Sequence, residues 1–445
     1  MLILFLRLIQ EHFTHEMLFI FSRRRVFMQY GLIGEHLGHS FSKMIHEKFG
    51  YYHYDLKEIS KDHIVEYFKE HPFKGINVTI PYKEIAFNAC DHLDEQAKSI
   101  QACNCIVNKD GKLYGHNTDY DGIVETFKHF DINLKDKKVL ILGKGGASKA
   151  FEAVCKDHQA AIVQIVYYKP YPGCITYEDV QRSYLDADIL INATPVGMAM
   201  HSNASPIDLS PFTNLEFVFD AIYNPLNTKL IQQAKKLNIR CTNGLLMLVA
   251  QAKYAAEYFL NQKIDMDLDS LVDTIILQTC NLVFIGMPSC GKSTISRQLA
   301  NNLHKEWIDL DEEIEKEAGM KIAEIFERYG EDRFRNFETQ VTFKNCIKNN
   351  VVIACGGGII LRKENIEALS QNGIIIYLDR PLDNLIRHDP SRPKLKEGIH
   401  TLYKERKDLY EKACDIKIKN DQTIQKTMQI CIESLKNKNL YKKFK

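Results

Sequence analysis

The stretch from Gly286 to Thr294 contains residues that can bind phosphate. It reads Gly-Met-Pro-Ser-Cys-Gly-Lys-Ser-Thr and follows an apolar run, Leu282 to Ile285. This spacing is typical of a loop whose backbone N–H groups surround phosphate oxygens, while its lysine reaches the β- and γ-phosphates and its serine holds Mg²⁺. A glycine-rich turn that binds nothing is the alternative, but the strand before and the helical pattern after favour a nucleotide site. We predict ATP contacts at Gly286, Ser289, Gly291, Lys292, Ser293 and Thr294.

Two alternating carboxylates follow that loop. Asp309 and Asp311 end the run Trp307 to Asp311, and a later strand, Val351 to Ala354, leads into Gly356-Gly357-Gly358. This spacing suits one carboxylate for Mg²⁺ and the other for a hydroxyl nucleophile. Two solvated acids on a loop are the alternative. Beside a phosphate loop, the sequence favours the catalytic interpretation.

More than half of the chain precedes the phosphate loop, and polar side chains recur there at the ends of apolar runs. Ser40 and Ser42 stand one residue apart at a predicted helix start, where capping uses only one hydroxyl. Asn77 and Thr79 share one face of a predicted strand, and Lys83 follows it. This face is either the wall of a binding site or half-exposed, with a surface lysine.

An amide and a carboxylate extend this set. Asn104 lies in the apolar run from Ala102 to Val107, and a buried amide requires hydrogen-bond partners. Asp119 lies in a polar turn that enters a helix. It is either the N-cap or a free site carboxylate, because Thr118 and Asn117 cap equally well.

A second glycine loop, Gly143 to Ala150, closes the short strand Lys138 to Leu142. Glycines between a strand and a helix N-terminus bring N–H groups and the positive helix end to a pyrophosphate. The next strand ends in Tyr167-Tyr168-Lys169, without the carboxylate that binds a ribose 2′-hydroxyl, so Lys169 favours NADP. Further strand-and-turn repeats predict a doubly wound parallel sheet. We predict cofactor contacts at Gly143, Gly145, Gly146, Ala147, Lys169, Thr194 and Gly244.

Composition narrows the class of protein. The 445 residues contain 58 Lys and Arg against 57 Asp and Glu, which gives no electrostatic reason to expect nucleic acid or a membrane surface. Twelve scattered cysteines indicate reduced thiols in a cytosol, with Cys103 and Cys105 on one predicted strand face. The apolar segment Met1 to Val26 is too interrupted by charge to span a membrane and lacks a signal-peptide cleavage site. We expect it to be an upstream extension before a natural start at Met28, or an amphipathic helix.

Taken together, the stretches from about Met28 to Leu277 resemble shikimate dehydrogenase. Three family motifs carry the resemblance, namely the serine pair, the Asn-Val-Thr strand with its lysine, and Asn117-Thr118-Asp119. It implies that Lys83 and Asp119 are catalytic in the NADP-dependent reduction of 3-dehydroshikimate to shikimate, with Lys83 as proton donor. It also implies substrate contacts at Ser40, Ser42, Asn77, Thr79, Asn104, Tyr223 and Gln251. Lys43, Lys144 and the segment 167–169 depart from the family pattern and leave the cofactor preference open.

The second half, from Asn281 to about Ile430, resembles shikimate kinase. The resemblance implies that Ser293 and Asp309 hold Mg²⁺ and that Asp311 orients the substrate 3-hydroxyl. It implies that Arg335 and Arg406 clamp the shikimate carboxylate, with Glu338 holding an arginine. The resemblance also implies that the backbone of Gly357 and Gly358 approaches the substrate ring. Arg387 is expected against the nucleotide base, and Arg392 on a mobile lid that looks shorter than usual.

We therefore predict an α/β protein with a two-lobed dehydrogenase over residues 28–277 and a P-loop kinase over 278–445. The substrate lobe is expected at 28–122 and about 245–277, the Rossmann-like NADP lobe at about 123–244, and a closing helix at 261–277. The predicted function is consecutive reduction and MgATP-dependent phosphorylation in aromatic amino-acid biosynthesis, in the cytoplasm. We expect small-molecule substrates, no nucleic-acid or membrane partner, a monomeric kinase half and an oligomer, if any, through the dehydrogenase half. The alternatives are an NAD-preferring quinate/shikimate dehydrogenase fused to the kinase, and a non-catalytic shikimate sensor.

Overall fold

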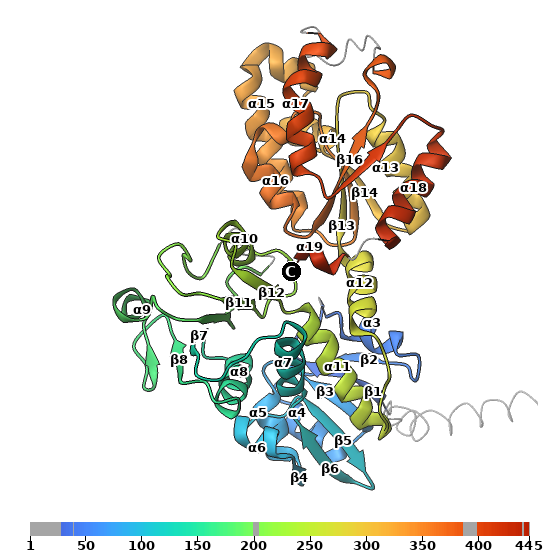
Figure 1. Cartoon of the computed structure of the whole chain (residues 1–445). Helices are drawn as coiled ribbons and strands as arrows, with labels where there is room; N and C mark the ends of the chain where they lie inside the picture. The colour runs from blue at the N-terminus through green and yellow to red at the C-terminus, as the bar shows by residue number, and fades with distance from the viewer. Residues whose placement is uncertain (1–27, 39, 199–203, 386–397, 438–439, 445) are drawn as a thin grey trace, which may run out of the picture. The chain divides into compact units, whose positions relative to one another are not determined.

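The structure is a computed structural model that describes residues 28–38, 40–198, 204–385, 398–437 and 440–444. The expected extension at residues 1–27 lies outside this part. The chain forms two compact units (Figure 1). The first runs to Thr126 and includes Leu248–Asp265, and the second holds Phe127–Met247 and the chain from Met266 onward.

The described part of the first unit has a mixed sheet in the order β2-β1-β3-β5-β6-β4. Its strands are β1 (Met28–Gly34), β2 (Asp55–Glu58), β3 (Phe73–Val78), β4 (His92–Leu93), β5 (Cys105–Lys109) and β6 (Lys112–His116). β1 pairs in parallel with β2 and β3, whereas β5 runs antiparallel to β3 and β6. The strand predicted over 102–107 begins only at Cys105. Cys103 lies before this strand, so the prediction that Cys103 and Cys105 share one strand face is wrong.

Helices that alternate with these strands complete the first unit. They are α3 (Ser42–Lys48), α4 (Ile64–Glu70), α5 (Lys83–Ala89), α6 (Glu95–Ile100), and the parts of α7 (Thr118–His129) and α11 (Leu245–Leu260) that fall in this unit. Buried side chains of β1, β3, α4 and α5 form one apolar core, which includes Ile33, Phe68, Phe73 and Ile76. This core fixes the strand ends at which the polar residues stand.

The second unit contains two parallel sheets in its described residues. The first has the order β12-β11-β10-β7-β8-β9, and its strands are β7 (Lys138–Leu142), β8 (Ile162–Val166), β9 (Cys174–Ile175), β10 (Ile189–Asn192), β11 (Phe217–Asp220) and β12 (Arg240–Asn243). Its helices are α8 (Gly146–Asp157), α9 (Tyr177–Ser183) and α10 (Lys229–Lys236). All four residues of β10 are buried, as in a parallel strand covered on both faces. The predicted doubly wound sheet is confirmed.

The other parallel sheet has the order β14-β15-β13-β16-β17. Its strands are β13 (Asn281–Ile285), β14 (Glu306–Asp309), β15 (Val351–Ala354), β16 (Gly373–Asp379) and β17 (Ile416–Lys419). Its helices include α13 (Lys292–Leu303), α14 (Leu310–Ala318), α15 (Ile322–Cys346), α16 (Lys363–Leu369), α17 (Ile399–Ala413), α18 (Ile424–Asn437) and α19 (Tyr441–Phe444), with the short turns η2 (Ile359–Leu361) and η3 (Leu382–Asn384). Phosphate-loop and carboxylate residues therefore follow the carboxyl ends of parallel strands, where α/β sheets bind ligands.

The helix expected over 261–277 is wrong in its start. α12 runs from Leu268 to Thr279, and Asp267 caps it by accepting a bond from the N–H of Asp269. Asn261 has a φ of 52°, in the left-handed region that ends helices. The spacing of apolar residues alone did not reveal that residues 261–267 are not helical.

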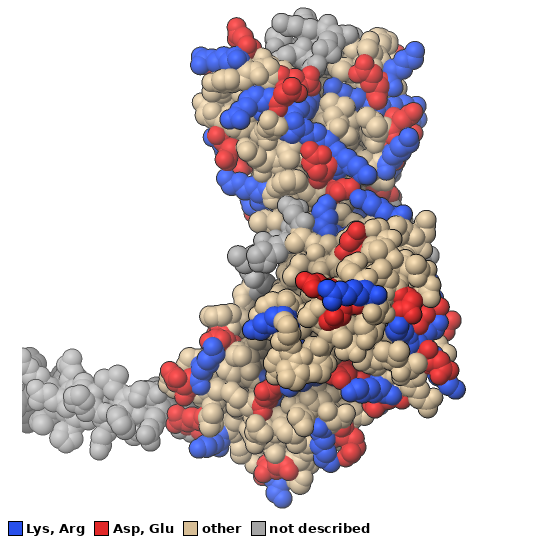
Figure 2. All heavy atoms as spheres, turned by 90° about the vertical axis from the view of Figure 1, so that its left-hand side faces the viewer, with Lys and Arg blue, Asp and Glu red and all other residues tan. Residues whose placement is uncertain are grey.

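The distribution of charged side chains on the surface agrees with the nearly equal numbers of basic and acidic residues. Figure 2 shows one face of the molecule, on which Lys and Arg side chains are interspersed with Asp and Glu. In the described residues, no helix is long and apolar enough to cross a bilayer. All twelve cysteines are free thiols, as predicted.

Candidate active sites

Lys83 and Asp119 form the centre of the polar site in the first unit. Lys83 is the first residue of α5, and its Nζ donates to Asp119 Oδ2 at 2.5 Å. Asp119 lies inside the first turn of α7, which begins at Thr118, so the alternative that it is the N-cap is wrong. The side chains are 20% and 12% exposed, so the ion pair is shielded but open to a small molecule.

Asn104 connects this ion pair to the sheet. Its Nδ2 donates to Asp119 Oδ1 at 2.9 Å, and its Oδ1 accepts from the N–H of Thr118 at 2.7 Å. The buried amide is therefore bonded on both sides, as predicted for this position. Both Asp119 oxygens have donors, which fixes the carboxylate facing the lysine.

Asn77 extends the chain of hydrogen bonds. Its Nδ2 donates to the backbone oxygen of Asn104 at 3.2 Å, and its Oδ1 accepts from the hydroxyl of Tyr54 at 2.7 Å. Nothing in the sequence around Tyr54 indicated a site residue, because the contact joins positions 23 residues apart. Thr79 follows β3 and lies half-buried beside it.

The remaining predicted substrate residues of this half lie in two different units. Ser40 Oγ accepts from the N–H of Ser42 at 3.2 Å, and Phe41 is the N-cap of α3 without a side-chain capping bond. Gln251, on α11, accepts a bond from the hydroxyl of Thr118 at 3.3 Å, which brings it to the same polar site. Tyr223 belongs to the second unit and is half-buried.

The glycine loop between β7 and α8 suits an anionic ligand. Gly143 has a φ of 100°, and a Cβ there would lie 2.9 Å from the carbonyl oxygen of Ala193, so glycine is required. Gly145 precedes α8, and a Cβ added there would meet no atom within 4 Å. The first turn of α8, which includes Gly146 and Ala147, carries no acidic residue. An open helix N-terminus without a competing carboxylate fits a dinucleotide pyrophosphate.

Thr194 and Gly244 have structural contacts of their own. Thr194 donates to the Oδ1 of Asn192 at 2.7 Å, at the carboxyl end of β10. A Cβ on Gly244 would collide with the backbone of Ala221. The close approach of two chain segments thus requires a glycine at 244, whether or not a cofactor contacts it.

Lys169 and three tyrosines, Tyr167, Tyr168 and Tyr171, follow the end of β8, and Lys144 reaches Tyr171 from the loop after β7. Lys144 Nζ lies 3.5 Å from the centre of the Tyr171 ring, and Lys169 Nζ lies 5.4 Å from that of Tyr168. Lys144 and Lys169 are exposed, as is Tyr168. The group offers two positive charges beside aromatic faces, and Lys144 adds one that the family pattern does not predict.

The phosphate loop leads from β13 into α13. Gly286 and Gly291 have φ values of 147° and 96°, and Ser289 also has a positive φ, at 62°. Lys292 Nζ donates to the carbonyl oxygens of Gly286 and Met287, each at 2.9 Å. The first turn of α13 has no acidic residue, so the loop and helix end suit a polyphosphate.

Ser293 and Asp309 supply oxygen ligands beside that loop. Ser293 Oγ donates to Asp309 Oδ2 at 2.7 Å, while Asp309 Oδ1 accepts the N–H of Asp311 and caps α14. A hydroxyl and a carboxylate are ligands that Mg²⁺ prefers, so the residues fit the ion. Asp311 lies on the next turn and faces the same cavity.

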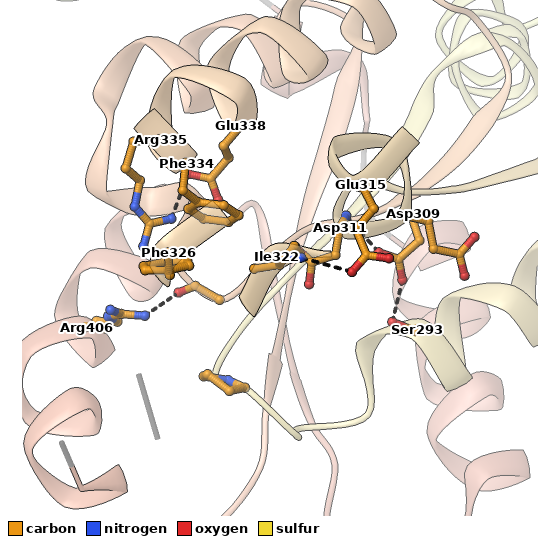
Figure 3. A pocket seen from close by; sticks show the side chains of 15 residues that line it. Ser293, Asp309, Asp311, Glu315, Ile322, Phe326, Phe334, Arg335, Glu338 and Arg406 are labelled. Carbon is orange, nitrogen blue, oxygen red and sulfur yellow. Dashed lines mark hydrogen bonds and ion pairs between the residues drawn. The ribbon is translucent and has the colours of Figure 1, made fainter. Parts of the chain in front are cut away.

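A cavity of about 310 Å³ is lined by the residues predicted to hold Mg²⁺ and shikimate, whereas Lys292 and the phosphate-loop glycines are not part of its lining. In Figure 3, Ser293 and Asp309 lie on one side, Arg335 and Glu338 on the other, with Asp311 between them. Its lining consists of Pro288, Ser293, Asp309, Asp311, Glu312, Glu315, Ile322, Phe326, Phe334, Arg335, Glu338, Gly356, Gly357, Gly358 and Arg406. Phosphate-side ligands and guanidinium groups therefore face one small space.

Arg335 is held within this cavity by acids. It donates to Glu338 at 2.8 Å and to Glu331 at 3.1 Å, and its side chain is 8% exposed. Burial acts to lower the pKa of Arg335, but the charges of Glu338 and Glu331 raise it overall. The Nε of Arg335 and of Arg406 and one oxygen of Glu338 are buried without a partner in the described structure. Orphaned guanidinium donors fit a carboxylate ligand.

The triple glycine makes room for side chains. A Cβ on Gly356 would lie 2.6 Å from Asp311, and a Cβ on Gly358 would collide with the Arg335 guanidinium. Gly357 presents its carbonyl oxygen to Arg406 at 3.0 Å and to the hydroxyl of Tyr410 at 2.5 Å. The sequence predicted close approach to a ligand, whereas the structure gives close approach of the site's own residues as a reason.

Three supporting residues were missed from the sequence: Glu331, Arg362 and Tyr410. Arg362 donates to the backbone oxygen of Arg335 at 3.0 Å. Glu331 stands four residues before Arg335 on α15, and Tyr410 stands four residues after Arg406 on α17, so helical spacing was a usable signal for these two. The predicted Arg387, Arg392 and their lid lie outside the described residues.

These features define a class. A parallel sheet with an open glycine loop, a lysine–aspartate site, and a phosphate loop with convergent arginines describe an oxidoreductase and a P-loop kinase in one chain. Residues 32–106 match the family model "Shikimate dehydrogenase substrate binding domain", and residues 288–436 match "Shikimate kinase". The chain belongs to the shikimate dehydrogenase family, and its C-terminal half carries a shikimate kinase domain.

Relatives and solved structures agree for the first half. The chain is 34% identical over 253 residues to "Shikimate dehydrogenase (NADP(+))" of Clostridium beijerinckii, covering 53% of this chain and 93% of that protein. It resembles the structure of shikimate dehydrogenase 1 from Peptoclostridium difficile, with a TM-score of 0.51, 34% identity, and coverage of 56% and 97%. The structure of a chorismate mutase/shikimate 5-dehydrogenase fusion protein from Clostridium acetobutylicum matches with a TM-score of 0.52 and 33% identity. This match covers 56% of this chain and 96% of that one. The chain is a bifunctional oxidoreductase and kinase of the shikimate pathway.

Proposed function

We propose that the chain reduces 3-dehydroshikimate to shikimate with NADPH and then phosphorylates shikimate at its 3-hydroxyl with MgATP. The carrying observation is that one chain holds two polar sites, with the Lys83–Asp119 pair in one and with Asp311 and Arg335 lining a common cavity in the other. The product of the first reaction is the substrate of the second, which gives the two sites a common purpose.

In the first reaction, NADPH supplies the hydride. Lys83 donates a proton to the ketone oxygen as negative charge develops there. Asp119, held by Asn104, fixes the direction of the Lys83 side chain. Ser40, Ser42, Asn77, Thr79, Gln251 and Tyr223 are proposed to bind the carboxylate and hydroxyl groups of the substrate.

The choice of NADP rests on charge. Lys144 and Lys169 place two ammonium groups near the end of β8, where a 2′-phosphate is recognised in dinucleotide-binding sheets. The relative from Clostridium beijerinckii is named for NADP(+), and a shikimate 5-dehydrogenase from Thermus thermophilus, 27% identical with a TM-score of 0.50, was solved with NADP(H) and shikimate; that match covers 55% of this chain and 97% of that one. Both support the proposal.

In the second reaction, MgATP supplies the phosphoryl group. Arg335 and Arg406 bind the shikimate carboxylate, and Asp311 orients the 3-hydroxyl and accepts its proton. The backbone of the phosphate loop and Lys292 hold the phosphates, while Ser293 and Asp309 would hold Mg²⁺. Positioning and charge neutralisation supply most of the acceleration in phosphoryl transfer.

We further propose that the protein works in the cytoplasm on small molecules, without nucleic-acid or membrane partners. A monomeric kinase half, and self-association only through the dehydrogenase half, complete the proposal. Sedimentation of the purified full chain tests this part independently of activity.

The decisive experiment incubates purified full chain with 3-dehydroshikimate, NADPH and MgATP, and follows NADPH oxidation and shikimate 3-phosphate by mass spectrometry. Formation of both products supports the proposal, and EDTA should stop only the second. Activity greater with quinate and NAD would support the quinate/shikimate dehydrogenase alternative. Shikimate binding without turnover of either substrate would support the sensor alternative and overturn ours.

A further inference from the structure

Tyr54 presents a buried hydroxyl to the proposed dehydrogenase site. It lies just before β2, its side chain is fully buried, and its Oη lies 2.7 Å from Asn77 Oδ1. Neither the proposed chemistry nor the family motifs use this residue. A buried hydroxyl on a site amide nevertheless decides how that amide points.

The orientation of the Asn77 amide follows from two of its hydrogen bonds. Asn77 Nδ2 faces the backbone oxygen of Asn104, which only accepts, so this end must be the NH₂ group. Asn77 Oδ1 then faces Tyr54 and accepts its O–H. If the amide were flipped, two oxygens would face each other at Asn104. The NH₂ group also carries a second hydrogen, which is the one available to a ligand.

The ring of Tyr54 is itself held in place. His46 stacks on it, with ring centres 4.0 Å apart and an interplanar angle of 5°, and His46 Nδ1 bonds the hydroxyl of Tyr52 at 2.7 Å. Burial lowers the pKa of His46 to about 3, so the stacked ring stays neutral. His46 stands on α3, whose first residue is Ser42. The stack therefore ties the serine-bearing helix to the amide of Asn77.

We propose that Tyr54 is a positioning residue for 3-dehydroshikimate. Its hydroxyl fixes the Asn77 amide so that the second N–H of Nδ2 is directed at an acceptor oxygen of the substrate. This inference rests on the proposed function, because it takes Asn77 as a substrate contact. It assigns Tyr54 to ground-state binding and leaves proton transfer to Lys83.

The test is Tyr54→Phe, which removes one oxygen and keeps the ring. Loss of one well-aligned hydrogen bond predicts a KM for 3-dehydroshikimate raised about 5- to 10-fold. The KM for NADPH, the pH profile of kcat and the kinase rate of the same protein should stay unchanged. Tyr67→Phe is the matched control, because Tyr67 is also buried in this unit and its hydroxyl has no partner in the described structure. It should leave every value unchanged.

A double variant distinguishes positioning from a general packing effect. In an Asn77→Ala background, Tyr54→Phe should add less than about 2-fold to KM, because the amide it orients is gone. An additive effect there would overturn the proposal. So would an unchanged KM in the single variant, or a Tyr54→Phe protein that fails to fold while Tyr67→Phe folds. Wild-type protein that does not reduce 3-dehydroshikimate would instead overturn the proposed function.

Discussion

Lys83 Nζ lies 2.5 Å from Asp119 Oδ2, at the meeting point of the first turns of two helices, α5 and α7. The two residues stand 36 positions apart in sequence, yet Asn104 connects them to the sheet through the other Asp119 oxygen. An ammonium held this way has a fixed direction, so that its proton can be aimed at one oxygen of a bound substrate.

Lys83→Ala should therefore lower kcat for 3-dehydroshikimate reduction by roughly 10²- to 10⁴-fold, as expected for loss of a general acid. The kinase rate of the same protein should remain at the wild-type value. Lys98→Ala is the matched control, since it removes an exposed lysine paired with Glu95 at 2.8 Å. A dehydrogenase rate in Lys83→Ala within a factor of three of wild type would contradict the assignment.

Gly358 faces the guanidinium of Arg335, and a Cβ at this position would collide with it. In Gly358→Ala the arginine must move, which strains its bond to the buried Glu338. We expect the KM for shikimate in the kinase reaction to rise by about 10-fold or more. Steady-state assays at saturating ATP measure it, with the dehydrogenase rate as the internal control. Unchanged shikimate affinity would show that Arg335 does not bind the substrate.

The sequence predicted most of the second half, because its site residues lie within or next to recognisable local patterns. The loop from Gly286 to Gly291 lies directly between a strand that ends at Ile285 and a helix that begins at Lys292, as the sequence predicted. Arg335 and Glu338 are one helical turn apart, so their ion pair was accessible to spacing arguments.

Contacts between distant segments were not predictable in this way. Tyr54 reaches Asn77, and Arg362 reaches the backbone of Arg335, only because sheet order and packing bring them together. The helix expected from Asn261 failed for a different reason. The apolar residues between Asn261 and Asp267 suggested one continuous helix. The positive φ of Asn261 instead ends α11, and α12 begins only at Leu268.

Asp121 predicts a pH-dependent stability. Burial, and then the charge of Asp94, raise its pKa from 3.8 to about 7. The folded state therefore binds this proton more tightly than the unfolded state, so the stability that Asp121 contributes is present below about pH 4. It is lost as the pH rises to about 7.

Asp121→Asn removes this titration. Its melting temperature should match wild type near pH 4.5 and exceed it by about 2–4 °C at pH 8. Calorimetry of both proteins across this range measures the difference. Asp220, whose pKa burial raises to about 6, titrates in both proteins and cancels. A difference that stays constant with pH would contradict the expectation.

Lys144 and Lys169 are the charges on which the proposed NADP preference depends. Both are exposed beside tyrosine rings, and a 2′-phosphate is present in NADPH but absent from NADH. Lys144→Ala and Lys169→Ala should each raise the KM for NADPH by roughly 10-fold, and the KM for NADH by less than 2-fold. Because exposed charges are screened, the wild-type advantage for NADPH should also shrink between 0.05 and 0.5 M salt. Lys156→Ala, which removes an exposed lysine from the far end of α8, is the matched control. Equal losses for both cofactors would mean that these lysines bind the shared pyrophosphate rather than the 2′-phosphate, and the preference would then have to come from another residue.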